Sequence, residues 1–133
     1  MDASTINKYK KYSIPKLIQK ATTVFNKFIR ERDKDCNCIS CDKKKELQAG
    51  HFYSGGHYPS LKFNENNVHG QCERCNYYLS GDLNNYRINL IKKIGIAEVE
   101  KLDKLASYYK RMGFKWDRYF LIEIICKYSE KRQ

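Results

Sequence analysis

Apolar residues recur at helical spacing near the start of the chain. Ser13 is a typical helix N-cap, and Pro15 lies in the first turn expected after it. Beyond these residues, apolar positions return every three or four residues: Leu17, Ile18, Ala21, Val24, Phe25, Phe28 and Ile29. This pattern predicts an amphipathic helix over 14–32. The preceding residues 1–12 are polar and rich in lysine without such spacing, which predicts a flexible basic arm.

The middle of the chain carries shorter apolar runs and many turn-forming residues. Residues 33–47 are charged and typical of turns. After them we expect, in order, a strand over 47–53, a loop over 54–60, a short second strand over 61–63 and a turn over 64–67.

Helical spacing returns in the last part of the chain. One helix is predicted from about Asn76 to Gly95, with an apolar side made of Leu83, Tyr86, Leu90, Ile91 and Ile94. A second, over 97–111, should turn Val99, Leu102, Ala106 and Tyr109 inward and stop at Gly113. The third, over 116–131, is apolar on almost every side between Tyr119 and Cys126, which indicates deep burial or contact with another subunit.

Together these elements predict an α+β fold in which a small core is surrounded by helices. At 133 residues we expect one domain over 13–133. Its expected parts are an N-terminal helix over 14–32, a core over 36–94 and C-terminal helices over 96–131.

Four of the six cysteines form two C-x2-C pairs, with 30 residues between the pairs: Cys38/Cys41 and Cys72/Cys75. Four thiolates at this spacing suit one tetrahedral Zn²⁺ without an open coordination position, which makes a structural site. Cys36 could compete with Cys38, but only Cys38 completes a C-x2-C pair. Cys126, in an apolar segment, is expected to be a small core residue.

The net charge of +11 favours a polyanionic partner, most plausibly nucleic acid. Tyrosines alternate with basic residues, an arrangement that suits both base stacking and phosphate contact. The side chains that we expect to contact phosphates are Lys10, Lys11, Lys62, Arg74 and Arg87. No run approaches the ~18 apolar residues of a membrane-spanning helix, and no signal-peptide pattern opens the chain. These features and the paired cysteines predict a protein of the reducing cytoplasm without a membrane partner.

A closed zinc site performs no chemistry, so reactive groups must be sought among the polar residues that it holds in place. Three stand out: His51 follows Gly50, Asn67 lies five residues before Cys72, and Asn76 directly follows Cys75. Of the other histidines, we expect His57 in an exposed loop. His69 is expected to be structural, supporting the zinc loop.

The order of cysteine pair, histidine, asparagine, cysteine pair and asparagine resembles the zinc-containing HNH endonucleases of the ββα-metal fold. The zinc arrangement is similar to that of phage recombination endonuclease VII. From about residue 13 onward, further segments look like the NinG/Rap family of lambdoid phages, whose longer N-terminal part we expect to be missing here. These segments are Phe28-Ile29-Arg30, Cys38-Ile39-Ser40-Cys41, Ala49-Gly50-His51-Phe52, Leu61-Lys62-Phe63-Asn64-Glu65, His69-Gly70-Gln71-Cys72, Cys75-Asn76, Ser80-Gly81 and Tyr86-Arg87.

The resemblance implies a DNA endonuclease that cleaves Holliday junctions or other branched DNA during phage recombination in a host bacterial cell. By this resemblance Asn76 would be a ligand of one catalytic Mg²⁺ or Mn²⁺, and Asn67 would orient the loop and the base. His51 would be the general base, because a neutral imidazole can accept a proton near neutral pH. Symmetric cutting of a four-way junction needs two active sites, so we expect a C2 homodimer with the helices over 14–32 and 116–131 as candidate interfaces.

The chain departs from these families in its acidic residues. HNH enzymes often carry an Asp or a His just before the base, where this chain has Gly50, and NinG-like proteins often carry an Asp where it has Gln48. The candidates for a second ligand of the catalytic metal are Glu65, Asp82 and His69. Two alternatives stay open: an HNH nicking endonuclease without junction preference, and a non-catalytic zinc module that binds nucleic acid, which Gly50 favours.

Overall fold

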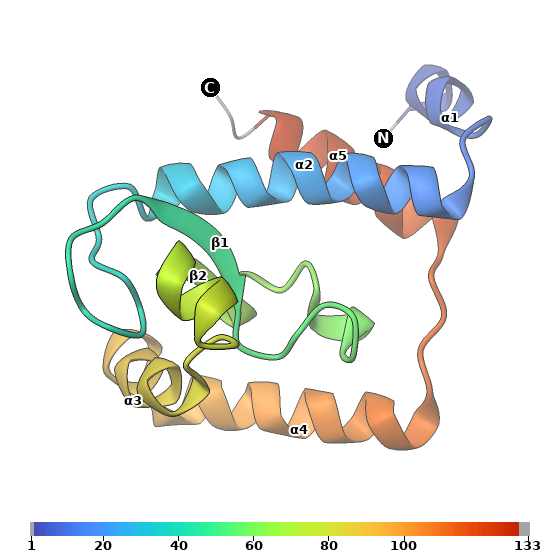
Figure 1. The fold of residues 1–133 in the computed structure, drawn as a ribbon. Helices are drawn as coiled ribbons and strands as arrows, with labels where there is room; N and C mark the ends of the chain where they lie inside the picture. Colours follow the sequence, from blue (N-terminus) through green and yellow to red (C-terminus); the bar gives the residue numbers. More distant parts are fainter. Residues whose placement is uncertain (1, 131–133) are drawn as a thin grey trace. The chain divides into compact units, whose positions relative to one another are not determined.

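The structure, a computed structural model, describes residues 2–130 of the chain (Figure 1). It has a mixed α+β fold with a small two-stranded sheet, as the sequence predicts. Its main elements are α1 (Ala3–Tyr9), α2 (Ile14–Arg32), β1 (Leu47–His51), β2 (Val68–Cys72), α3 (Leu83–Ile94), α4 (Ile96–Met112) and α5 (Arg118–Glu130). None of the helices in this part of the chain is long and apolar enough to span a membrane.

The chain forms two compact units, where the sequence leads us to expect one domain over 13–133. The central unit is Ile29–Phe114. The helical unit combines the described residues before Ile29 with those after Phe114. The sequence gives no sign of this division, because the helical unit is built from both ends of the chain. Its two long helices, α2 and α5, are separated in the sequence by the central unit.

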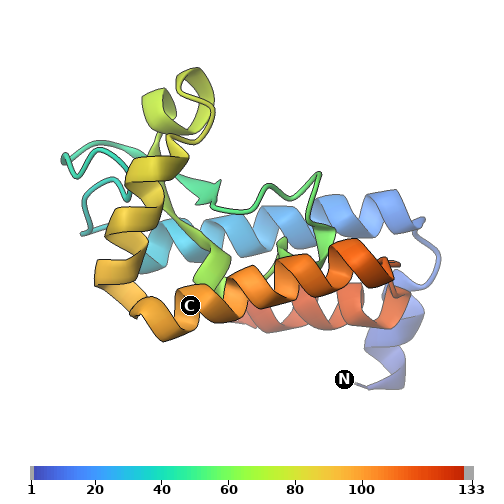
Figure 2. The ribbon, with the colours of Figure 1, turned by 90° about the horizontal axis from the view of Figure 1, so that it is seen from below.

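The core of the helical unit lies between α2 and α5, which run side by side (Figure 2). The ring of Tyr128 packs edge-on against Phe25, with 4.8 Å between ring centroids, and at a tilt against Phe28, with 5.0 Å between ring centroids. The expected helix over 14–32 is confirmed with its bounds. In α5, however, Tyr119 and Phe120 are 55% and 42% exposed, so only one side of that helix is buried.

The N-terminal segment contains a helix, α1, where the sequence predicts an arm without regular structure. The Asp2 carboxylate caps this helix by accepting a hydrogen bond from the Thr5 amide at 2.8 Å. The Arg118 guanidinium, at the start of α5, donates to the main-chain carbonyls of Lys10 and Tyr12. A seven-residue helix has too few turns for an apolar period to be visible in the sequence.

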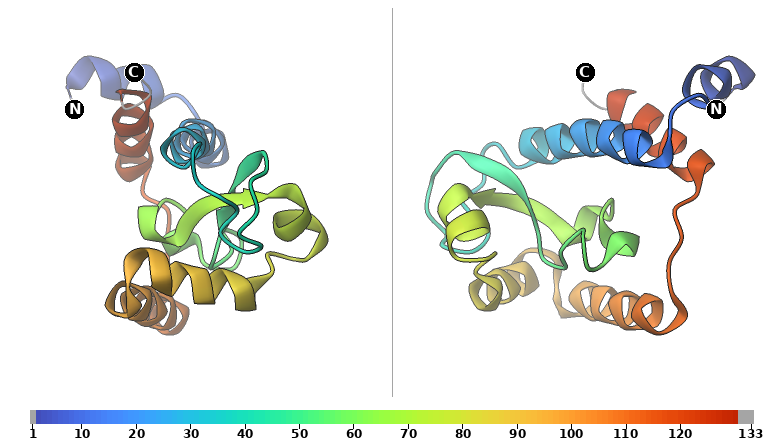
Figure 3. Two further views of the ribbon diagram at one scale, coloured as in Figure 1. Left: turned by 90° about the vertical axis from the view of Figure 1, so that its left-hand side faces the viewer. Right: turned by 45° about the vertical axis from the view of Figure 1, so that its right-hand side comes forward.

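In the central unit, β1 and β2 form an antiparallel hairpin that pairs Leu47 with Cys72 and His51 with Val68 (Figure 3). The first strand is confirmed, although it ends at His51. The second strand expected over 61–63 is wrong, because Pro59–Leu61 forms a 3₁₀ turn and Val68–Cys72 is the partner of β1. Local turn bonds already occupy this segment: the Leu61 amide donates to Tyr58, and the Leu61 carbonyl accepts from Asn64.

The helix expected from Asn76 begins later, at Leu83. A π-helical turn, Arg74–Tyr78, comes first, and three residues with positive φ then separate it from α3. The helix over 97–111 is confirmed as α4, but Tyr109 is 38% exposed and does not face inward. α3 and α4 contribute most of the central core, whose buried members are Ile39, Leu61, Tyr86, Leu90, Val99, Leu102 and Ala106.

Candidate functional site

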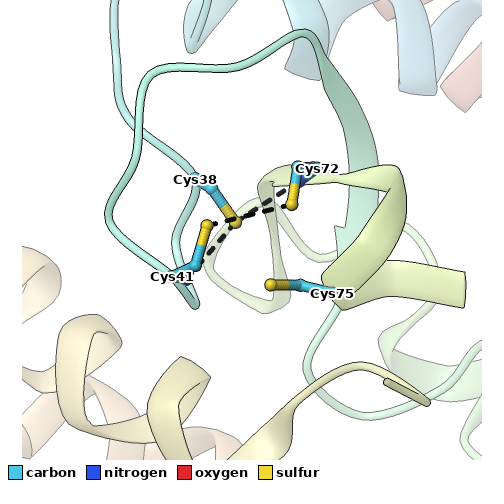
Figure 4. A group of neighbouring side chains, drawn as sticks. All are labelled: Cys38, Cys41, Cys72 and Cys75. Carbon is cyan, nitrogen blue, oxygen red and sulfur yellow. Dashed lines mark hydrogen bonds between the residues drawn. The ribbon is translucent and has the colours of Figure 1, made fainter. Parts of the chain in front are cut away.

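Four cysteine sulfurs gather at the base of the β hairpin, turned toward a common centre (Figure 4). The Sγ atoms of Cys38, Cys41, Cys72 and Cys75 all lie within 4.8 Å of one another, and those of Cys41 and Cys72 are 3.9 Å apart. The edge of a zinc–thiolate tetrahedron is about 3.8 Å, whereas a disulfide needs about 2.05 Å. The predicted grouping is confirmed, and it fits one structural zinc ion. Cys36 lies outside this group, which favours Cys38 as the ligand.

Backbone amides prepare one of these sulfurs for metal binding. The amides of Cys41 and Cys72 donate to Cys38 Sγ at 3.5 and 3.3 Å. Burial alone would raise the pKa of Cys38, but these amides outweigh it and bring the pKa to about 7. Because the thiolate is the form that binds metal, these amides favour the metal-binding form of Cys38.

Behind the hairpin lies a buried charged network that the sequence does not reveal. Asp33 is 2% exposed and accepts hydrogen bonds from Arg32 at 2.8 and 2.9 Å and from the Gly70 amide at 2.8 Å. Lys93 lies 3.3 Å from the same carboxylate. Burial would raise the pKa of Asp33, yet these partners lower it to about 2. The network joins the end of α2 to β2. The sequence does not predict it, because Arg32 and Asp33 are neighbours in a charged stretch and look like ordinary surface residues.

His69 belongs to the same network. It is a structural residue, as predicted, but it bonds to Arg32 and Asn66 and not to the cysteine loop. Its Nε2 donates to the Asn66 carbonyl at 2.9 Å, and its Nδ1 accepts from the Arg32 guanidinium at 3.1 Å. Burial and the nearby cations lower the pKa of His69 to about 4, so the ring is neutral. Both ring nitrogens are therefore occupied by protein groups, and neither of these groups is a cysteine of the cluster.

His51 is the last residue of β1 and is partly exposed. Its Nε2 donates to the main-chain carbonyl of Lys62 at 2.9 Å, because a carbonyl can only accept. Burial lowers the pKa of His51 below the ordinary histidine value. The neutral ring thus carries its proton on Nε2 and its lone pair on Nδ1, and the described residues give Nδ1 no hydrogen-bond partner. This is the state that a general base requires.

Asn67 fastens the two ends of the loop that follows His51. Its side chain is fully buried, with Oδ1 accepting from the Tyr53 amide at 2.8 Å. Its Nδ2 donates to the carbonyls of Tyr53 and Leu61 at 2.9 and 3.0 Å. Because Leu61 directly precedes Lys62, these bonds also fix the carbonyl that holds the His51 ring.

Asn76 lies in the π-helical turn, directly after Cys75. Its Nδ2 donates to Gln48 Oε1 at 2.9 Å, which leaves Asn76 Oδ1 to accept from a donor or to bind a cation. Gln48 and His51 both lie on β1, so one strand carries the partner of Asn76 and the candidate base. The hydrogen bonds of the Asn76 and His51 side chains in the described part of the chain go to Gln48 and Lys62, not to each other.

The candidate carboxylates lie in different places. Asp82 is beside the cysteines, with Oδ2 3.7 Å from Cys75 Sγ and Oδ1 accepting from Asn85 at 3.0 Å. Glu65 opens a 3₁₀ turn, and its main-chain carbonyl accepts from Arg32 at 3.1 Å.

The absence of an acid at position 50 has a steric reason. A Cβ on Gly50 would lie 2.1 Å from Gln71 Oε1, so no side chain fits there while Gln71 keeps its place.

The basic side chains expected to contact phosphates differ in how freely they reach solvent. Three of them are exposed: Lys10, Lys11 and Arg74. Lys62 is partly exposed beside His51, and burial lowers its pKa. Arg87 is already engaged, because it forms a two-pronged ion pair with Asp103 at 3.0 and 2.8 Å.

These features define a small α+β protein organised around a four-cysteine cluster that could hold a metal ion. The family described as "Bacteriophage Lambda NinG protein" matches residues 2–132 of the sequence, so the chain belongs to the NinG family. It is 41% identical over 116 residues to Protein ninG of Salmonella phage P22, which covers 86% of this chain and 55% of the relative. It is 44% identical over 88 residues to Protein ninG of Escherichia phage lambda, covering 65% and 43%. The chain thus spans about half the length of these curated relatives. No solved structure matches it.

Proposed function

We propose that this protein is a metal-dependent DNA endonuclease that acts on branched recombination intermediates, with His51 as its general base. The observation that carries the proposal is the hydrogen bond from His51 Nε2 to the Lys62 carbonyl. That bond fixes the tautomer and the ring orientation, and the lowered pKa keeps the ring neutral. A neutral imidazole with a free Nδ1 lone pair can take a proton from an attacking water.

The other two site residues suit supporting roles in the same reaction. Asn76 Oδ1 would hold a divalent cation, which supplies charge neutralisation at the phosphate and the leaving oxygen when it is bound. Gln48 orients that amide through its 2.9 Å hydrogen bond. Asn67 keeps the loop and the Lys62 carbonyl in place through its bonds to Tyr53 and Leu61. The order of hairpin, turn and helix supports the proposal of a ββα-metal core, which a zinc ion at the four cysteines would stabilise.

Charge supports DNA as the substrate. A net charge of +11 on 133 residues attracts a phosphate backbone. Arg74 lies just before Asn76 in the chain, and the Lys62 carbonyl accepts the hydrogen bond from His51. Two closely spaced cuts in a four-way junction require two active sites, so the proposal includes a homodimer with a twofold axis.

The test is cleavage of three labelled DNAs with identical arms: a synthetic four-way junction, a flap and a linear duplex, each with Mg²⁺ or Mn²⁺. We expect cleavage of the junction and little cleavage of the duplex. Equal cleavage of all three would instead indicate a nicking endonuclease without junction preference. Binding without cleavage under any metal condition would overturn the proposal in favour of a non-catalytic zinc module. His57→Ala, a change in an exposed loop, serves as the control variant and should cleave normally.

A further inference from the structure

The turn that carries Asn76 also carries the two most exposed large aromatic side chains of the described chain. Tyr77 is 74% and Tyr78 is 69% exposed, and their rings lie edge to face with centroids 5.0 Å apart. Two apolar neighbours are also open to solvent: Leu79 at 44% and Leu83 at 47%. We call this surface, Tyr77, Tyr78, Leu79 and Leu83, the tyrosine tip. Apolar side chains gathered in this way mark a binding surface more often than chance.

The tyrosine tip is held rigidly in spite of its exposure. The Leu79 amide donates to the Arg74 carbonyl at 2.8 Å, and the Gly81 amide donates to the Cys75 carbonyl at 2.8 Å. One end of the turn is therefore fixed to a cysteine of the metal centre. Backbone held in this way can present its side chains without losing conformational entropy on binding.

The other end of the turn is strained and clamped. Ser80, Gly81 and Asp82 have φ values of 52°, 92° and 43°, which non-glycine residues rarely adopt. The Gly81 carbonyl accepts from the buried Gln71 amide at 2.6 Å and from Ser40 at 3.3 Å. Such strain persists only where the surroundings enforce it, and it gathers at sites of function. Here the strained residues directly follow the exposed Tyr77, Tyr78 and Leu79.

We propose that Tyr77 and Tyr78 stack against unpaired or unstacked bases at the branch point of a DNA substrate. Aromatic rings stack on any base, whereas bases within a paired duplex are already covered by their neighbours. Tyr77 and Tyr78 directly follow Asn76 in the same turn, so a DNA backbone held at Asn76 would lie close to them. The exposed Arg74 at the start of the turn adds the phosphate contact. The inference rests on the DNA-binding part of the proposed function and not on cleavage.

Binding without added Mg²⁺ or Mn²⁺ tests this role, because cleavage then plays no part. Fluorescence anisotropy should compare a four-way junction with a linear duplex of the same length. In the Tyr77→Ala/Tyr78→Ala variant, junction affinity should fall by at least about fivefold, while duplex affinity stays unchanged. The Tyr77→Phe/Tyr78→Phe variant should bind as the unchanged protein does, because stacking does not need the hydroxyl. Tyr108→Ala, a change at a 44% exposed tyrosine on α4, is the matched control.

A second measurement covers the case in which the alanine variant folds poorly. Tyr77→Trp places a fluorophore in the tip, and its emission above the Trp116 background should be quenched by the junction but not by the duplex. Unchanged junction affinity in the alanine variant, or an equal loss for junction and duplex, would overturn the inference. A change from dimer to monomer in the alanine variant, measured by sedimentation, would also overturn the inference, because the tip would then be a protein interface. Selective junction binding without any cleavage would refute the endonuclease and leave the stacking role standing.

Discussion

His51 Nε2 donates a 2.9 Å hydrogen bond to the Lys62 carbonyl, although the two residues lie on opposite sides of a loop. The Asn67 side chain, bonded to Tyr53 and Leu61, keeps that loop closed. The hairpin that bears His51 is anchored at its other end, where Leu47 pairs with Cys72 of the metal centre. The ring of the candidate base is therefore held by main-chain geometry, which in turn depends on a hairpin that ends at the cysteine cluster and on one buried asparagine.

Loss of a cysteine from the metal centre should unfold the central unit. Structural zinc supplies on the order of 10 kcal/mol of apparent binding energy in small metal-folded modules, and that energy is coupled to folding. We expect one zinc per chain in the purified protein. Cys72→Ser should lose the metal and the circular dichroism of the central unit, while Cys36→Ser, just outside the cluster, keeps both. Folded protein without zinc would refute the structural role.

Asp33 should be the most sensitive carboxylate for stability. Asp33→Asn leaves Arg32 and Lys93 beside a neutral group, and removal of one partner from a buried pair typically costs about 3–5 kcal/mol. Glu98→Gln, which breaks a mostly exposed pair with Lys101, should cost under about 1 kcal/mol in the same denaturant titration.

The pH dependence of this effect follows from the lowered pKa. Because the folded pKa of Asp33 is about 2, below that of the unfolded chain, its contribution is complete above about pH 4. It is lost as pH falls through 4 toward 2, since protonation then favours the unfolded chain. The unchanged protein and Asp33→Asn should therefore converge in unfolding free energy at low pH. A constant difference at all pH values would contradict this account of Asp33.

An acid at position 48 should strengthen binding of the catalytic cation. Gln48→Glu keeps the side-chain length and the acceptor for Asn76 Nδ2, and it adds a carboxylate beside Asn76 Oδ1. Hard cations prefer such oxygens, so the Mg²⁺ concentration that gives half-maximal cleavage should fall. Asn76→Ala should lose cleavage, with partial recovery at high Mg²⁺. If Gln48→Glu needs the same Mg²⁺ concentration as the unchanged protein, the metal does not bind at this pair.

The exposed lysines of the helical unit should act through phosphates. Lys10→Ala/Lys11→Ala should weaken binding to junction and duplex alike. It should also reduce the slope of log affinity against log salt by roughly one for each phosphate that a lysine no longer neutralises. Selective loss of junction binding would instead make this segment a reader of DNA shape.

The sequence predicts those features that depend on local pattern. The apolar period locates α2 and α4, and the C-x2-C spacing locates the metal centre, because both signals are complete within a few turns or residues. The errors come from long-range constraints and from a missed turn signal. The segment 61–63 looks like a strand, but the Asn67 side chain and local turns hold it. The start of α3 is predicted too early because the turn signal of Ser80-Gly81, where the chain has positive φ, is passed over.

The sequence predicts which residues form the candidate site, but it does not predict how their side chains are held. His51, Asn67 and Asn76 stand out from their positions relative to the cysteines. Their partners, the Lys62 carbonyl and Gln48, cannot be identified from the sequence, because hydrogen bonds to main chain or across a hairpin depend on the register of the folded strands.

His51→Ala tests the central claim most directly, under single-turnover conditions on a saturating four-way junction with Mg²⁺. Positioned proton transfer usually contributes about 10²–10⁴-fold in rate, so cleavage should fall by that factor while junction affinity and zinc content persist. Because the pKa of His51 is lowered, the rate of the unchanged protein should rise with pH below about 6.5 and level off by neutrality. A folded, zinc-loaded His51→Ala protein that cleaves at the unchanged rate would remove His51 from the mechanism and contradict the account.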